Sequence, residues 1–139
     1  MPIRPEDLYA AARQLDQINP TLVSDEVCGR TIANRAYYAA FLATRDALRA
    51  QYGDPRFDVQ HTRLARALEK SGDPLVSGLG TLLRFLKLQR EKADYRPHAA
   101  FDSQFLVPLV LSRAKEILEM LPRATGSFSG DRLLTPGLP

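Results

Sequence analysis

Hydrophobic positions recur with helical spacing in five segments of the chain, which are separated by short stretches rich in proline, glycine or polar residues. The longest segment, 21–53, contains no proline and a single interior glycine, Gly29, which predicts one long helix. Its large apolar positions share one face: Val23, Val27, Tyr38, Phe41, Leu48 and Tyr52. A second face carries only small side chains: Ala36, Ala39, Ala40, Ala43 and Ala47. A helix with two such faces packs against several neighbours, so we expect it at the centre of a helical bundle.

Four shorter helices are predicted by the same periodicity, over 5–18, 61–70, 74–94 and from 100–104 to 121. Asp73 suits the N-cap of the fourth helix, with Pro74 behind it. In the fifth, Pro108 predicts a kink or the real start, and Pro122 predicts the end. No strand pattern of useful length occurs.

The expected fold is therefore all-α, a single up-and-down bundle of about five helices over residues 1–122. The stretch 123–139 is rich in glycine, serine and proline, which predicts a flexible tail. Only Leu133 and Leu134 offer this tail an apolar anchor.

The composition fits a soluble globular domain, with 139 residues, 45% hydrophobic and 25% charged. The formal charge is +3, and 15 of the 19 basic residues are arginine, a residue suited to bidentate contacts with phosphate or carboxylate. Cys28 is the single cysteine, which excludes an intramolecular disulfide and a cysteine-based zinc site.

Two histidines far apart, His61 and His98, are a poor basis for a metal site, so we expect neither metal nor cofactor. The first residues lack the apolar core of a signal peptide, and no apolar run is long enough to span a bilayer. These features predict a cytoplasmic protein with no membrane partner.

Candidate chemistry is concentrated in two polar clusters. The first is Asn34 and Arg35, in otherwise apolar surroundings on the long helix. A guanidinium there either pairs with a carboxylate elsewhere in the bundle or faces a polar groove, where it meets phosphate or RNA. The second cluster spans 90–96, where Arg90 and Asp94 are four residues apart and can bridge on one helix face. It is either a solvated helix end or part of a groove shared with Arg35.

The run RAYYAAF from Arg35 to Phe41, a short helix opening at His61, and Ala-Asp-Tyr closing the fourth helix together resemble the prokaryotic HEPN domain. The resemblance covers the long helix through the fifth. It implies a helical bundle that forms a homodimer and, in active members, cleaves RNA without a metal. In those members an arginine and a histidine a few residues apart form the site, and pairs from both subunits meet in a dimer cleft. Many members accompany a nucleotidyltransferase in toxin–antitoxin or defence systems.

The resemblance implies that Arg35 is catalytic. If the two polar clusters share a groove with it, the candidate RNA or phosphate ligands are Asn34, Tyr38, Arg90, Asp94, Tyr95 and Arg96. Close relatives commonly carry a histidine directly after the phenylalanine, where this chain has Leu42, which cannot transfer a proton. His61 is then the candidate second catalytic residue. It follows Arg56 at a matching spacing, although that motif is expected by chance in so arginine-rich a chain. Its alternative role is to begin the third helix.

Three interpretations follow. The first is a HEPN-type RNA-binding protein or metal-independent endoribonuclease of a toxin–antitoxin or defence system. The second is a non-catalytic module that binds a nucleotidyltransferase or another protein partner through the dimer surface and the tail. The third is a bundle whose arginines are purely structural. An open cleft on which Arg35, His61 and Arg90 from two subunits converge favours the first, and a closed salt bridge at Arg35 favours the others.

Overall fold

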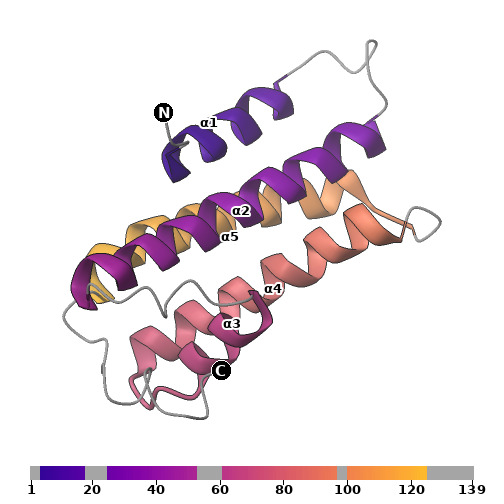
Figure 1. Cartoon of the computed structure of the whole chain (residues 1–139). Helices are drawn as coiled ribbons and strands as arrows, with labels where there is room; N and C mark the ends of the chain where they lie inside the picture. Colours follow the sequence, from indigo (N-terminus) through magenta and orange to yellow (C-terminus); the bar gives the residue numbers. More distant parts are fainter. Residues whose placement is uncertain (1–3, 18–24, 53–60, 97–99, 125–139) are drawn as a thin grey trace.

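The computed structural model describes residues 4–17, 25–52, 61–96 and 100–124. These residues form five helices and no strand, which confirms the all-α prediction (Figure 1). The helices are α1 (Pro5–Asp16), α2 (Asp25–Tyr52), α3 (His61–Glu69), α4 (Pro74–Tyr95) and α5 (Ser103–Ala124). None of these described helices is long and apolar enough to cross a membrane.

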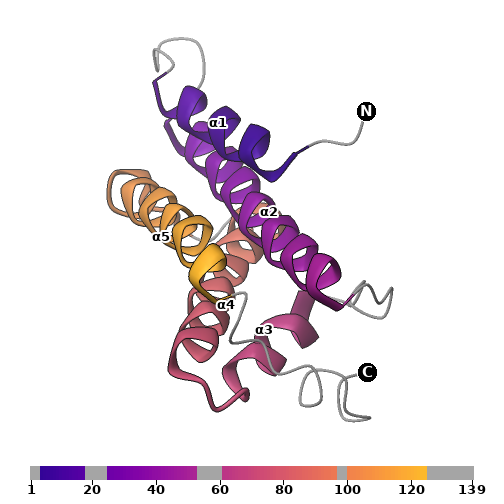
Figure 2. The ribbon, with the colours of Figure 1, turned by 90° about the vertical axis from the view of Figure 1, so that its left-hand side faces the viewer.

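The long helix α2 lies at the centre, as its two faces predicted. It packs against α1, α4 and α5, while α3 packs mainly against α4. Figure 2 shows α1 on one side of α2 and the α3–α4 pair on the other. On the small-residue face, Ala36, Ala39 and Ala40 are fully buried. Small side chains there let neighbouring helices approach closely, which suits α2 to its central position.

Gly29 lies where α2 packs tightly against α5. A Cβ atom at this position would lie 2.4 Å from Ser103 Oγ and 3.2 Å from Val107 Cγ2. A side chain there would therefore push the two helices apart. The interior glycine of the long helix is explained by packing rather than by backbone conformation.

Two residues of α2 differ in burial from the prediction for its apolar face. Val27 was expected in the core but is 55% exposed, because it lies at the rim of an open groove between α2 and α4. Tyr37, which the periodicity did not single out, is fully buried against the rings of Tyr38 and Phe41. Burial raises the pKa of the Tyr37 phenol, because the charged form loses its hydration.

Helix ends follow the predicted signals in α4 but not in α5. Asp73 Oδ1 accepts hydrogen bonds from the backbone N–H groups of Leu75 and Val76, at 2.9 and 3.2 Å, and so caps α4 as expected. In α5 neither proline breaks the helix: Pro108 lies inside it, and Pro122 lies in the last turn. The predicted end before Pro122 is wrong, since Ala124 is fully buried and its packing keeps the last turn helical.

Several sequence-based predictions fall on residues that the structure does not describe. These are the start of the long helix before Asp25, the stretch 53–60 with Arg56, His98, and the segment 125–139 with Leu133 and Leu134.

Candidate functional site

The two predicted polar clusters meet where α4 crosses α2 in the antiparallel direction. Asn34 Nδ2 on α2 donates a hydrogen bond to Asp94 Oδ2 on α4, at 2.8 Å. Arg90 Nε lies 3.0 Å from the same Asp94 oxygen, so the predicted Arg90–Asp94 bridge on one helix face is confirmed. One carboxylate oxygen therefore joins the two clusters.

Arg35 lies at the exposed end of this network. Its Nη1 donates to Asn34 Oδ1 at 2.8 Å. Because the Asn34 amide accepts from Arg35 and donates to Asp94, both of its ends are held. Arg35 itself is exposed, and no described carboxylate forms an ion pair with it. Within the described residues, Arg35 therefore forms no closed salt bridge and instead lines a polar groove.

Arg90 forms the interior end of the network, with 16% of its side chain exposed. Its Nη2 donates to the hydroxyls of Tyr38 and Tyr95, at 2.9 and 3.0 Å. Its guanidinium carbon also lies 5.2 and 4.9 Å from the centres of these two rings, within the range of cation–π attraction. Burial opposes the charge of Arg90, but Tyr38, Tyr95 and Asp94 outweigh it and raise the pKa of this guanidinium.

An open groove of about 400 Å³ runs along this junction. Its lining residues come from α2 and the end of α4: Val27, Arg30, Thr31, Asn34, Arg35, Ala93 and Asp94. Arg35 supplies a cation on one wall, and Asp94 supplies a carboxylate on the other. Asp94 already accepts a hydrogen bond from Asn34 and forms an ion pair with Arg90, whereas Arg35 has N–H donors left for a ligand.

Arg30, which the sequence reasoning missed, holds the end of α4 against α2. Its Nη1 donates to the backbone carbonyls of Lys92 and Ala93 at 3.0 Å and of Arg96 at 3.2 Å. Its Nε and Nη2 bind Glu26 Oε1 at 3.2 and 2.9 Å. A cation that pairs with the last carbonyls of a helix is favoured by its dipole. The only local signal for this role is the spacing of four from Glu26.

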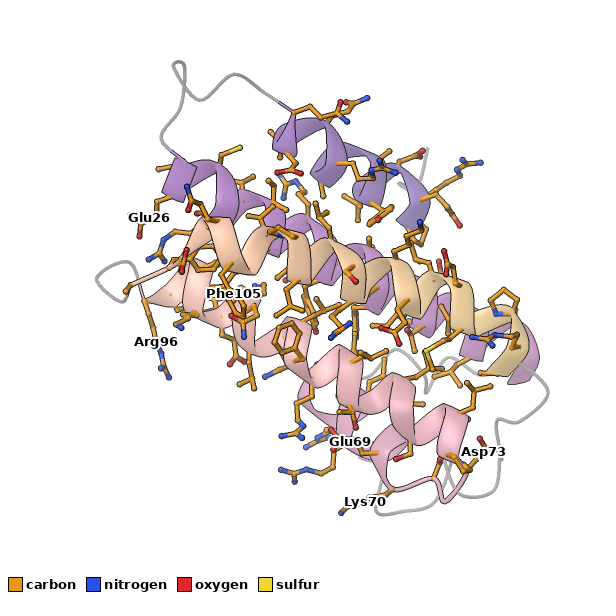
Figure 3. The ribbon with its side chains drawn as sticks, turned by 180° about the vertical axis from the view of Figure 1, so that it is seen from behind. Glu26, Glu69, Lys70, Asp73, Arg96 and Phe105 are labelled. Carbon is orange, nitrogen blue, oxygen red and sulfur yellow. The ribbon has the colours of Figure 1, made fainter. Side chains whose placement is uncertain are left out.

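Most of the predicted site residues are thus brought together, namely Asn34, Arg35, Tyr38, Arg90, Asp94 and Tyr95. Arg96 is not part of the groove, because its side chain points away from the body of the molecule (Figure 3). His61 is the first residue of α3, and its side chain lies outside the described residues. Leu42 is half-buried against the main core. Its side chain cannot transfer a proton, so this position supplies no acid or base.

Among the described residues, no group of three or more histidine, cysteine, aspartate or glutamate side chains is arranged to hold a metal ion. Comparisons with protein-family models, curated protein sequences and solved structures each gave no match. Functional inference for this chain therefore depends on the chemistry of the groove and on the resemblance of its sequence motifs.

Proposed function

We propose that this chain is a HEPN-like RNA-binding protein in which Arg35 binds a backbone phosphate at the α2–α4 groove. One observation carries this proposal: an exposed guanidinium is held in place by a chain of two hydrogen bonds and an ion pair. The chain runs from Arg35 through Asn34 and Asp94 to Arg90. Only one Nη1 donor of Arg35 is used by Asn34. The remaining N–H groups suit a bidentate contact with phosphate oxygens.

Tyr95 adds a second feature that suits RNA. The residue is 66% exposed, and Arg90 holds it by a hydrogen bond to its hydroxyl and a cation–π contact with its ring. An exposed aromatic side chain that is held in this way is a platform for stacking an unpaired base. A phosphate ligand and a stacking platform on one network favour single-stranded RNA over a duplex.

The activity we propose at the groove is binding rather than cleavage. Cleavage of RNA without a metal requires a group that removes the proton of the 2′-hydroxyl. Asp94 is the carboxylate that lines the groove, and its Oδ2 is already engaged by a hydrogen bond from Asn34 and an ion pair with Arg90. Leu42 has no exchangeable proton. The alternative is that Arg35 and His61 catalyse RNA cleavage, and a ribonuclease assay tests it.

A second candidate function is a non-catalytic module that binds a nucleotidyltransferase, another protein partner or a second copy of the chain. It is favoured by the apolar rim of the same groove, where Val27 is 55% exposed beside Thr31 and Ala93. Such a partner would cover Val27, whereas RNA would engage Arg35. Val27→Ser and Arg35→Ala therefore separate the two functions.

The test is fluorescence anisotropy with single-stranded RNA in EDTA. We expect wild type to bind and Arg35→Ala to lose about tenfold in affinity, as for the loss of one charge-assisted contact. Arg13→Ala, which removes an exposed arginine from α1, is the matched control and should bind as wild type does. Equal affinity of wild type and Arg35→Ala would overturn the proposal.

The same samples are incubated with total tRNA and mRNA, again in EDTA. We expect the RNA to remain intact. Cleavage that is lost in both Arg35→Ala and His61→Ala, with folding intact, would replace binding by catalysis as the function.

A further inference from the structure

We infer that a basic ridge on α3 and α4 forms a second contact for the RNA backbone, continuing the path that starts at Arg35. This inference rests on the proposed function. The basic ridge is defined here by Arg66 on α3 together with Arg84, Leu88, Lys92 and Arg96 on or directly after α4.

The positive charge of the protein is concentrated on the α3–α4 pair. Residues 61–96 contain eight basic and four acidic side chains, a net charge of +4 with the histidines neutral. The whole chain carries +3, so the remaining residues contribute a net −1. An excess confined to one part of the fold is the electrostatic pattern expected of a polyanion-binding face.

The geometry of α4 arranges part of this charge in a row. Arg84, Leu88, Lys92 and Arg96 follow one another at intervals of four residues, a spacing that places helical side chains next to each other. Arg84 and Arg96 are exposed, and Leu88, between them, is 52% exposed. Figure 3 labels Arg96 at one end of α4 and Lys70 after α3, and both side chains point away from the body of the molecule.

Two hollows accompany the ridge and adjoin at Leu88. One, of about 370 Å³, has basic lining residues from both helices, Arg66, Arg84 and Lys87. The other, of about 190 Å³, is lined by Leu88, Gln89, Glu91, Lys92 and Arg96, two of which are basic and one acidic. A strand lying in both hollows would place phosphates near the basic groups and a ribose or base against the Leu88 side chain.

The cations of the basic ridge are available to a ligand, whereas Lys87 in the first hollow pairs with Glu91. No described carboxylate pairs with Arg66, Lys92 or Arg96. Arg84 binds Glu69 at 2.8 Å, but its side chain is 58% exposed, and an exposed pair of this kind contributes little free energy. The ridge also begins beside the groove, since the Arg96 carbonyl accepts a hydrogen bond from Arg30 of the groove lining.

The experiment compares two single-stranded RNAs, one of about 4 and one of about 16 nucleotides, which bracket typical single-strand site sizes. Affinities are measured by anisotropy over a series of salt concentrations. The ridge variant is Arg66→Ala/Arg96→Ala. The control, Arg13→Ala/Lys115→Ala, removes the same charge from exposed positions on α1 and α5.

We expect the ridge variant to bind the short RNA as wild type does and the long RNA about tenfold more weakly. The slope of log affinity against log salt for the long RNA should fall by about 1.4, for two lost phosphate contacts. Arg35→Ala should weaken both RNAs, and the control should weaken neither. If the ridge variant binds the long RNA as wild type does while Arg35→Ala does not, this inference is overturned and the proposed function stands. If wild type binds neither RNA, the proposed function falls, and this inference with it.

Discussion

Arg30 and Arg35 lie five residues apart on the same helix and line the same groove, yet their surroundings differ completely. Arg30 has 13% of its side chain exposed, and its donors bind three carbonyls at the end of α4 and the carboxylate of Glu26. Its guanidinium also lies 5.3 Å from the centre of the Phe101 ring. Arg35 is exposed and has one described hydrogen bond, to Asn34.

The difference is set by α4 rather than by α2. Where α4 ends, it offers carbonyl groups that lack partners within the helix, and a guanidinium that reaches them becomes part of the fold. One turn further along α2, α4 offers Asp94, and the α2 residue that reaches this carboxylate is Asn34. Arg35 is then held indirectly, with donors left for a ligand. A structural role for Arg30 and a binding role for Arg35 follow from the same crossing of two helices.

The largest effect should come from Arg30→Ala. This change leaves carbonyls of Lys92, Ala93 and Arg96 without their partner and removes the pair with Glu26. We expect the free energy of unfolding to fall by about 3 kcal/mol, the upper range for hydrogen bonds to a charged group. Urea denaturation measures it. A loss below about 0.5 kcal/mol, the level expected for the Arg13→Ala control, would show that Arg30 does not stabilise the fold.

Asp94→Asn tests the link between the two roles. The amide keeps the size of the carboxylate but removes the charge that pairs with Arg90, whose side chain is largely buried. We expect a loss of about 1–2 kcal/mol in unfolding free energy together with weaker RNA binding, because Asn34 and Arg35 lose their fixed positions. Asp16→Asn, at an exposed position at the end of α1, is the control. Unchanged RNA affinity in Asp94→Asn would show that Arg35 needs no support from α4.

Tyr37 is a buried core residue whose contribution to stability depends on pH. Its pKa is raised by burial above the ordinary value of about 10, so the unfolded chain releases this proton at lower pH than the folded chain does. Its contribution to stability is therefore complete below about pH 10 and is lost as the pH rises beyond it. We expect the unfolding free energy of wild type to fall more steeply than that of Tyr37→Phe, by up to about 1.4 kcal/mol per pH unit.

Denaturation at a series of pH values from about 8 to 11 measures this slope, across the tyrosine pKa of about 10. Tyr95→Phe, which removes an exposed phenol, is the matched control. Identical slopes in wild type and Tyr37→Phe would contradict the assignment.

The smallest effect on stability should come from Arg35→Ala. Its side chain is exposed, and its single described hydrogen bond is to a neighbouring residue. We expect the free energy of unfolding to change by less than about 0.5 kcal/mol. Thermal denaturation beside Arg13→Ala measures this. A loss comparable to that of Arg30→Ala would mean that both arginines are structural.

Local patterns were enough to predict most of the fold. The periodicity placed five helices, Asp73 was correctly identified as a cap, and the alanine face of α2 was correctly placed in the interior. The spacing of Arg90 and Asp94 predicted their ion pair, because neighbours on one helix are fixed by the helix itself.

What the sequence could not supply depends on how helices meet. Tyr37 and Tyr38 are adjacent, yet Tyr37 is fully buried while Tyr38 binds Arg90 of α4, and this difference depends on how the neighbouring helices pack against α2. The bond between Asn34 and Asp94 joins residues 60 positions apart, and no local pattern encodes it. Pro122 is a helix-breaking signal that the packing of Ala124 overrides.

One paired measurement tests the central claim directly: RNA affinity and unfolding free energy, determined on the same preparations of wild type, Arg35→Ala and Arg30→Lys. Lysine keeps the charge of Arg30 but not its fork of donors, so the carbonyl contacts are weakened while the chain remains able to fold. We predict that Arg35→Ala loses about tenfold in RNA affinity with stability unchanged, and that Arg30→Lys loses stability with RNA affinity unchanged. RNA binding by Arg35→Ala at wild-type affinity, with its fold intact, would contradict the account.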